Sequence, residues 1–330
     1  MIEVKSNGAL NLVVDAGRME CMPMGVSIGG PLDALSCRLA NIMVGNTQDA
    51  AAIEIGIFPF RVEFQIDALI AVTGAPGAAK VGSRSLAPYW CRWVSAGDTL
   101  SIEPPAKGGR TYIGVAGGIA VSEVLGSRST DLRAGIGGMN GRGLKRGDVL
   151  PVGKSLNSPN RGSHGNGTDF GIAPQAVKNL FSELSGNTVQ LRCVAAAEHK
   201  DFSYEATQRF MHEPYTVRPE SNRMGYRLEG ERLDLVVQRE LFSHGIVPGT
   251  VQVPPSGQPI IQLADANTCG GYPKIATVIE ADLWKLGQVC AGMHLHFKML
   301  GEDDALAALR DDHMEVLSLR RDIELMAGRF

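Results

Sequence analysis

The side chains best suited to bind an anion lie in a glycine-bounded turn that runs from Gly126 to Arg133. Two serines, Ser127 and Ser129, flank Arg128 in this turn. Hydroxyls, backbone N–H groups and a guanidinium fork together match the acceptors of a carboxylate or a phosphate. The same residues also suit a structural turn whose arginine pairs with a nearby acidic side chain. We predict that Ser127, Arg128 and Ser129 bind substrate or another anion, and the structural alternative stays open.

A second glycine-rich segment, 135–142, follows this turn directly. It holds four glycines in seven residues and ends at Arg142. Glycines without side chains permit close approach of a ligand or of another chain. We therefore expect a loop in which the backbone, more than the side chains, would contact a ligand or another chain.

Two further polar turns, Ser221–Leu228 and Asp265–Lys274, lie in the second half of the chain. Each combines Arg or Lys with Tyr and small residues, between predicted strands. Around a concave site such groups can bind a small polar amide or acid, and a pair of salt-bridged turns is the alternative. The predicted catalytic residues, as base, orienting group or proton donor, are Asp265, Tyr272 and Tyr226. The predicted substrate- or anion-binding residues of these turns are Arg223, Arg227, Asn267, Thr268 and Lys274.

Common catalytic motifs are incomplete in this sequence. The run Gly25-Val26-Ser27-Ile28-Gly29 matches the nucleophile elbow of serine hydrolases, but prolines stand where that motif needs a strand before and a helix after. Neither a P-loop nor a dinucleotide-binding fingerprint is complete. His294 and His296 share one face of a predicted strand, yet the sequence offers no evident third ligand. We predict no metal site.

Charge and composition restrict the class of partner. The 330 residues include 32 Lys and Arg against 35 Asp and Glu, for a formal charge of -3. This balance argues against nucleic acid or an anionic membrane as partner. No apolar run approaches the roughly 18 residues that a membrane span needs, and the first residues lack a signal-peptide pattern. We predict a cytoplasmic protein that binds neither nucleic acid nor membrane.

Hydrophobic periodicity predicts a mainly β protein with few helices. Helical spacing is found at 33–44, 175–184, 281–288 and 303–326. Strands do not alternate regularly with these helices, which disfavours a doubly wound α/β sheet. The predicted strands are 10–14, 62–66, 69–73, 88–94, 99–102, 111–115, 189–194, 226–228, 233–237, 250–253, 260–263 and 274–279.

The chain is predicted to divide close to residue 160. Residues 155–168 are rich in Ser, Gly, Asn and Pro, which is typical of a linker or exposed loop. We expect an N-terminal β-rich domain over 1–160, a linker and short helix over 161–187, and a second β domain with a C-terminal helix over 188–330.

Several motifs occur in a fixed order from about residue 12 to residue 300. In the first half they include Asp33, Gly45-Asn46, Gly117-Gly118-Ile119, Leu125 to Thr130 and Gly147-Asp148; in the second half they are Ser221 to Gly230, Pro248 to Pro254, Gly257 to Ile260 and Asp265 to Pro273. This series resembles the biotin-dependent carboxyltransferase family, also called the allophanate hydrolase subunit 2 family. The resemblance implies two related β-barrel domains, the second of them cyclophilin-like.

The resemblance also implies a part in a multi-subunit enzyme. The expected function is that of the C-type subunit of an ATP-dependent 5-oxoprolinase-like hydrolase, which opens the lactam of 5-oxo-L-proline to L-glutamate together with B-type and A-type partners. One alternative is the carboxyltransferase half of a biotin-dependent enzyme of the urea carboxylase type. Another is a non-catalytic module that binds a kinase-inhibitor-like B-type partner. ATP is then a cofactor of the complex, and biotin arrives only on a separate protein, because the chain lacks the Met-Lys-Met acceptor.

Overall fold

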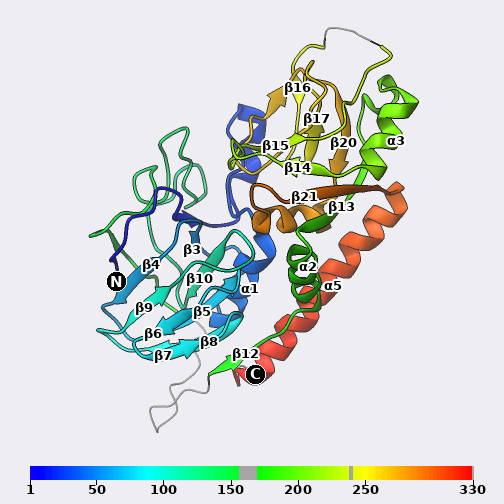
Figure 1. The fold of residues 1–330 in the computed structure, drawn as a ribbon. Helices are drawn as coiled ribbons and strands as arrows, with labels where there is room; N and C mark the ends of the chain where they lie inside the picture. Colours follow the sequence, from blue (N-terminus) through cyan, green and yellow to red (C-terminus); the bar gives the residue numbers. More distant parts are fainter. Residues whose placement is uncertain (156–168, 238–240, 329–330) are drawn as a thin grey trace. The chain divides into compact units, whose positions relative to one another are not determined.

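Two structural units make up the chain (Figure 1). The computed structural model describes residues 1–155, 169–237 and 241–328. Unit 1 comprises Met1–Met19, Gly29–Val177 and Glu315–Phe330, and unit 2 comprises Glu20–Ile28 and Lys178–Met314. Most of the predicted linker 155–168 lies outside the described residues.

Unit 1 contains two six-stranded sheets whose strands all pair antiparallel. The strand order of the first sheet is β11 (Val149–Leu150), β1 (Ile2–Val4), β4 (Phe60–Phe64), β9 (Thr99–Ile102), β6 (Ala79–Val81) and β7 (Arg84–Leu86). The order of the second sheet is β12 (Phe170–Gly171), β8 (Trp90–Val94), β5 (Ala68–Gly74), β10 (Thr111–Val115), β3 (Ala52–Ile55) and β2 (Leu12–Val14).

Alternating side chains explain how the first sheet joins the core. In β4, Phe60, Val62 and Phe64 are buried, whereas Arg61 is exposed. The buried side of β4 shares one hydrophobic cluster with apolar residues of β5 and β10. By contrast, β5 and β10 are buried on both faces, because helix α1 (Ala34–Val44) packs against their other side.

Helix α1 begins and ends with local signals that the sequence carries. The Asp33 carboxylate accepts a hydrogen bond from the N–H of Ser36 at 2.8 Å, and Gly45 ends the helix in the left-handed conformation. Gly114 of β10 permits the close packing of α1, because a Cβ there would lie 2.7 Å from the carbonyl oxygen of Ala40. The predicted helix 33–44 is confirmed.

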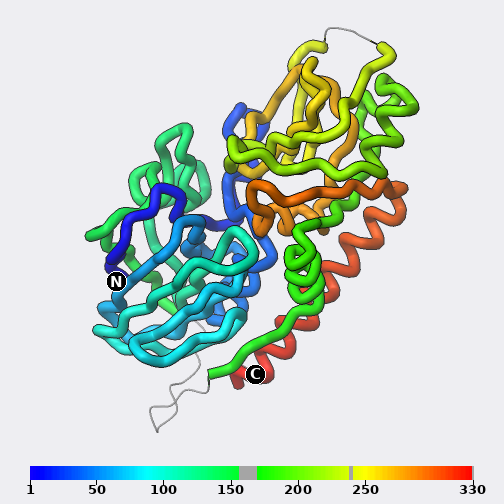
Figure 2. Tube along the Cα trace, in the orientation of Figure 1, coloured from blue at the N-terminus to red at the C-terminus, as the bar shows by residue number. Residues whose placement is uncertain are grey.

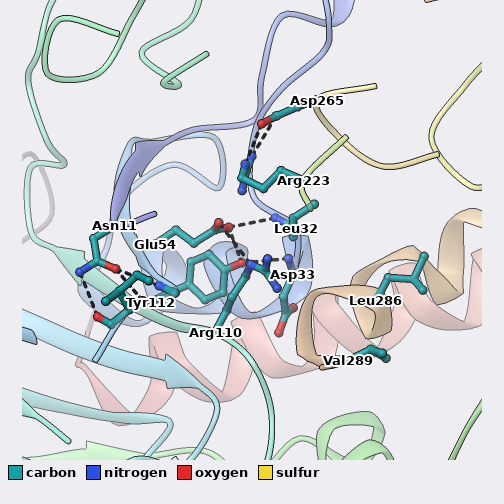
Figure 3. A network of polar contacts seen from close by, with 12 residues as sticks. Asn11, Leu32, Asp33, Glu54, Arg110, Tyr112, Arg223, Asp265, Leu286 and Val289 are labelled. Atoms are coloured by element: carbon teal, nitrogen blue, oxygen red, sulfur yellow. Dashed lines mark hydrogen bonds and ion pairs between the residues drawn. The ribbon is translucent and has the colours of Figure 1, made fainter. Parts of the chain in front are cut away.

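A buried polar network fixes the start of α1 (Figure 3). The Tyr112 hydroxyl donates to Oε2 of Glu54 at 2.7 Å and accepts from the N–H of Asp33 at 2.9 Å. The same Glu54 oxygen accepts from the N–H of Leu32 at 3.0 Å. Burial raises the pKa of Tyr112 well above its usual value, and the charges of Glu54 and Asp33 raise it further. The phenol therefore stays protonated and acts as a structural donor.

Unit 2 contains a closed seven-stranded barrel. Its strand order is β13 (Thr188–Ala195), β20 (Lys274–Val278), β17 (Thr250–Gln252), β18 (Ile260–Gln262), β15 (Gly225–Glu229), β14 (Tyr215–Val217) and β21 (His294–Met299). Strands β13 and β21 are far apart in sequence but run parallel side by side, with Thr188 opposite His294 (Figure 2). The prediction of a mainly β protein with a barrel and few helices is confirmed.

The remaining helices and one small sheet complete the described structure. They are η1 (Met19–Met24), α2 (Gln175–Ser185), η2 (His199–Asp201), α3 (Tyr204–His212), α4 (Glu280–Leu283), η3 (Trp284–Gln288), the long helix α5 (Glu302–Met326) and the two-stranded sheet of β16 (His244–Gly245) and β19 (Cys269–Gly270). The predicted strand 233–237 is wrong, because only Leu235 forms a bridge there, to Phe202. Within the described ranges, no helix combines the length and the apolar character that crossing a membrane requires.

Asp282 of α4 is a fully buried carboxylate that joins the helix to β13. It accepts hydrogen bonds from the N–H of Arg192 at 2.8 Å and from Nη2 of the same arginine at 2.7 Å, and Lys285 Nζ lies 3.1 Å away. Burial by itself raises the pKa of Asp282, but Arg192 and Lys285 outweigh burial and lower it below the usual 3.8.

We expect Asp282→Asn to reduce the free energy of unfolding at pH 7 by about 2 to 3 kcal/mol, because it removes the counter-charge of Arg192. The cost is moderate since the Arg192 side chain is 34% exposed. A carboxylate with a lowered folded pKa stabilises the protein above its unfolded pKa, and this contribution is lost as the pH falls. Urea unfolding should therefore show a difference in the free energy of unfolding between the wild type and Asp282→Asn that is smaller at pH 3 than at pH 7. Asp234→Asn, in an exposed pair with Arg232, is the control. If Asp282→Asn destabilises the protein equally at pH 3 and pH 7, the lowered pKa of Asp282 is contradicted.

Candidate functional site

The predicted anion-binding turn of unit 1 holds a carboxylate of the chain itself. Asp15 is buried and accepts hydrogen bonds from the hydroxyls of Ser127 and Ser129 and from the N–H groups of Arg128 and Gly17. In this structure the donors of the turn are occupied by the Asp15 side chain, and binding of substrate or another anion by Ser127, Arg128 and Ser129 stays a prediction. The two serine hydroxyls are committed to that contact.

The guanidinium of Arg128 has other partners. Its Nε donates to the carbonyl of Val121 at 3.0 Å, and its Nη1 lies 2.6 Å from a carboxylate oxygen of Glu123. This is the arrangement of a structural turn whose arginine pairs with a nearby acid. The Arg128 side chain is 38% exposed, so part of it faces solvent.

In unit 2, the structure brings Arg223 and Asp265 together as a buried ion pair (Figure 3). Nε and Nη2 of Arg223 donate to the two carboxylate oxygens at 2.8 and 3.1 Å, and the N–H of Asp265 donates to the carbonyl of Arg223 at 3.1 Å. A bidentate pair of this kind fixes both turns in one geometry. Asp265 is therefore held as a partner of arginine and positions the segment that follows it.

Ser27 does not occupy a nucleophile elbow. It follows η1, not a strand, and residues Ile28–Leu32 separate it from the N-cap of α1. Its hydroxyl donates to the carbonyl of Asp265 at 3.4 Å. The serine-hydrolase interpretation has no structural support.

Lys274, at the first position of β20, is a buried cation in a polar cluster. Its Nζ donates to Nε2 of His244 at 2.6 Å and lies 4.0 Å from Oε2 of Glu198. The other His244 nitrogen, Nδ1, lies 3.0 Å from the carbonyl of Phe242. This contact assigns the proton to Nδ1 and leaves Nε2 as the acceptor for Lys274.

The environment of Lys274 favours proton transfer. Burial lowers the pKa of Lys274, and the charge of Glu198 opposes part of that shift. The His244 side chain is 40% exposed, so it links the buried amine to solvent. A lysine with a lowered pKa releases its proton more readily than a free lysine does. We define Lys274, His244 and Glu198 as the lysine cluster.

Gln252 adds an unused donor to the lysine cluster. It lies opposite Lys274 in the pairing of β17 with β20. Its Oε1 accepts from Nε2 of Gln262 at 3.0 Å, whereas its own Nε2 is buried and has no hydrogen-bond partner among the described residues. A Cβ added to Gly270 would lie 2.5 Å from this nitrogen. The amide N–H of Gln252 and the ammonium of Lys274 thus belong to paired positions of neighbouring strands.

The remaining predicted residues of unit 2 differ in burial and in partners. The Tyr226 hydroxyl is buried and donates to the carbonyls of Leu286 and Val289 at 2.9 and 3.2 Å, so it has a structural role in this structure. Tyr272 is 47% exposed. Exposed positions are also occupied by Arg227 and Asn267, and Thr268 is half-buried.

Sequence reasoning missed Glu198, His244 and Gln252. Of these three, only Gln252 could have been noticed from the local sequence. It is a polar residue between Val251 and Val253, in a strand that is expected to be buried. His294, considered as a metal ligand, instead contacts the Thr216 hydroxyl at 3.0 Å. In the part of the chain that the structure describes, no group of three or more potential metal-ligating His, Cys, Asp or Glu side chains occurs.

Comparison with known proteins identifies the class to which this fold belongs. Residues 24–299 match the family model described as the carboxyltransferase domain, subdomain A and B. The chain therefore belongs to the carboxyltransferase domain family, as the resemblance in its sequence predicted.

Relatives of this chain include parts of two kinds of enzyme. It is 40% identical over 311 residues to the C component of 5-oxoprolinase from Escherichia coli (strain K12), covering 94% of this chain and 95% of that protein. It is 35% identical to the corresponding 5-oxoprolinase component of Haemophilus influenzae, over 98% of both chains. The crystal structure of the K. lactis urea amidolyase matches with a TM-score of 0.84 and 30% identity, covering 96% of this chain but only 20% of that one.

We expect Asp15→Asn to lower the free energy of unfolding by about 2 to 4 kcal/mol, because buried donors lose a charged acceptor. Ser127→Ala removes one donor and leaves Asp15 with the others, so a smaller loss is expected. Chemical denaturation of both variants measures the two values. Equal losses in the two variants would show that Asp15 is not the centre of the turn.

We expect Glu198→Gln to lower the pKa of Lys274 further, because Glu198 opposes the effect of burial. NMR titration of ¹³Cε-labelled lysines, with Lys274→Gln used to assign the signal, measures this pKa. Glu229→Gln, at an exposed position of β15, should leave the titration unchanged. A Lys274 pKa that rises in Glu198→Gln would rule out the described electrostatics.

Proposed function

We propose that this chain is the C-type subunit of a cytoplasmic, ATP-dependent 5-oxoprolinase-type complex, which opens the lactam of 5-oxo-L-proline to L-glutamate. The observation that carries the proposal is the 40% identity to the E. coli 5-oxoprolinase component over 95% of its length. The match covers nearly all of both chains, which supports a role for this chain in a complex of the same kind. We infer that the chain acts with B-type and A-type subunits.

The lysine cluster suits the chemistry of a lactam. Resonance makes the lactam carbon a poor electrophile, and the ring nitrogen needs a proton as the C–N bond breaks. Lys274 in its protonated form can donate that proton, and His244 can return a proton from solvent. The unused N–H of Gln252 can donate to the carbonyl oxygen. We assign these roles to Lys274, His244 and Gln252.

Other predicted residues take supporting roles in this proposal. Asp265, paired with Arg223, positions the segment that leads to Lys274. Tyr272 is two residues from Lys274, and its exposed side chain remains a candidate donor to substrate. We also propose that Arg227, Asn267 and Thr268 contact the substrate.

The glycine-rich loop 135–142 does not form a phosphate cradle for ATP. The N–H of Gly138 donates to the carbonyl of Arg128, and the N–H of Gly141 donates to that of Gly137. A phosphate cradle needs such N–H groups to be available. We therefore place ATP binding on a partner protein and assign no step on this chain to it.

A second function is favoured by the structural match to the urea amidolyase. In that case the chain would be the carboxyltransferase half of a biotin-dependent enzyme that acts on a urea-like amide, with biotin carried by another protein. A module that binds a B-type partner without catalysis is the third possibility. The three differ in substrate, in biotin dependence and in turnover.

We expect the chain, co-expressed with B-type and A-type subunits, to support 5-oxoproline-dependent ATP hydrolysis and glutamate release. Lys274→Met should lower kcat about 100-fold or more, as expected for the loss of a general acid. Lys298→Met, at an exposed position of β21, is the matched control and should retain activity. Size-exclusion chromatography checks that each variant still assembles.

Other outcomes separate the alternatives. Carboxylation of urea that requires a biotinylated protein would favour the carboxyltransferase, and assembly without any turnover would favour the binding module. Full activity of Lys274→Met would remove the lysine cluster from the mechanism.

A further inference from the structure

A hollow of about 410 Å³ opens to solvent along strand β21 of unit 2. Strand β13 pairs with β21, and helix α3 packs against it (Figure 1). The volume lies within the range of small-molecule sites, and no residue of the lysine cluster lines it. We call it the β21 hollow, and its polar lining consists of Thr188, Gln190, His212, His296 and Lys298.

Two basic side chains of β21 lie in this hollow without a counter-charge. The strand alternates, so that Phe297 is buried, whereas His296 is half-buried and Lys298 is exposed. Neither His296 nor Lys298 makes a side-chain hydrogen bond or an ion pair with the described residues. The cross-strand neighbour of Lys298 is Arg192, another cation, whose own charge is met by Asp282. The β21 hollow therefore has positive charge to offer to a ligand.

The end of α3 adds a second imidazole. Nδ1 of His212 lies 2.8 Å from the carbonyl of Gln208, which assigns a proton to Nδ1. Nε2 then becomes a donor when the ring is protonated, and a nearby anion favours that form. Neither Asp nor Glu lines the hollow. Glu183 is close by, but its Oε2 accepts from the backbone N–H of Gln190 at 2.9 Å.

The β21 hollow also has an apolar part. Phe297 is 2% exposed and stacks on Phe210, with the ring centroids 4.3 Å apart, so its position is fixed by packing. Met211 and Met299 line the hollow as half-buried side chains. Thioether side chains adapt to irregular shapes and make favourable contacts with aromatic rings. An apolar surface suited to a hydrocarbon body thus adjoins the polar donors.

We propose that the β21 hollow is a binding site for a small organic phosphate, a phosphate monoester on an apolar or aromatic body. Lysine binds phosphate as a point charge, whereas the planar fork of arginine, which suits carboxylates, is absent from the lining. The Gln190 amide and the Thr188 hydroxyl can serve further phosphate oxygens. The site does not rest on the proposed function, and a variant at Lys298 can lose this ligand while it keeps lactam turnover.

Titration of the full chain with phenyl phosphate, followed by NMR of ¹³C-methyl-labelled methionines, tests the site. We expect saturable shifts of the Met211 and Met299 signals, assigned by Met→Leu substitution, while the signal of Met43 in α1 stays in place. Lys298→Gln and His296→Asn should each weaken binding roughly tenfold, as expected for the loss of a charge-assisted hydrogen bond. Lys80→Gln, at an exposed position of β6, is the matched control and should bind as the wild type does.

Inorganic phosphate and benzoate separate the two parts of the ligand. Both should bind more weakly than phenyl phosphate, because one lacks the apolar body and the other lacks the phosphate. Benzoate that binds as tightly would overturn the phosphate assignment, and inorganic phosphate that binds as tightly would overturn the role of Met211 and Met299. The absence of saturable shifts, or unchanged binding in the double variant of Lys298 and His296, would overturn the site itself. Unmoved Met43 signals in each variant show that it is folded.

Discussion

The burial of charge is the constraint that most shapes this molecule. Removing an ion from water costs roughly several kcal/mol unless a partner or hydrogen bonds replace the water. Three buried carboxylates meet this constraint in different ways. Asp15 accepts from hydroxyl and N–H donors, Asp282 lies between the cations of Arg192 and Lys285, and Asp265 pairs with the bidentate guanidinium of Arg223. In each case the carboxylate joins segments that are distant in sequence. The polar contacts therefore help to specify which loops lie together on the β framework.

The lysine cluster lies where two strands of the barrel begin and end. Strand β5 is buried throughout and carries no charged side chain, whereas β3 holds the buried Glu54 in its interior. Lys274 is the first residue of β20, and Gln252 is the last of β17, next to an irregularity in the pairing of these strands. A register shift turns side chains away from the regular alternation. The lysine cluster thus arises at a point where the barrel departs from ideal geometry.

Local patterns made most of the fold predictable, while the site depends on pairs that no local pattern reveals. Strands β9 and β10 have the predicted bounds, and α1 carries its own capping residues. The strand predicted at 233–237 failed because apolar residues alone do not supply a pairing partner. Polar turns correctly directed attention to Arg223, Asp265 and Lys274. His244 and Glu198 lie 30 and 76 residues from Lys274 in the chain, so their contact follows only from the folded barrel.

Lys274 and Arg18 are both buried cations, but their side chains differ in whether they can lose the charge. The ammonium of Lys274 can lose its proton when burial makes the charged form costly, and its neighbour His244 can accept one. Arg18 has no such option, because a guanidinium stays protonated in proteins. Its buried charge is stabilised by the carbonyls of Val124 and Ser129, which accept hydrogen bonds from Nε and Nη2. The two cations thus meet the same energetic constraint in different ways, because the chemistry of the two side chains differs.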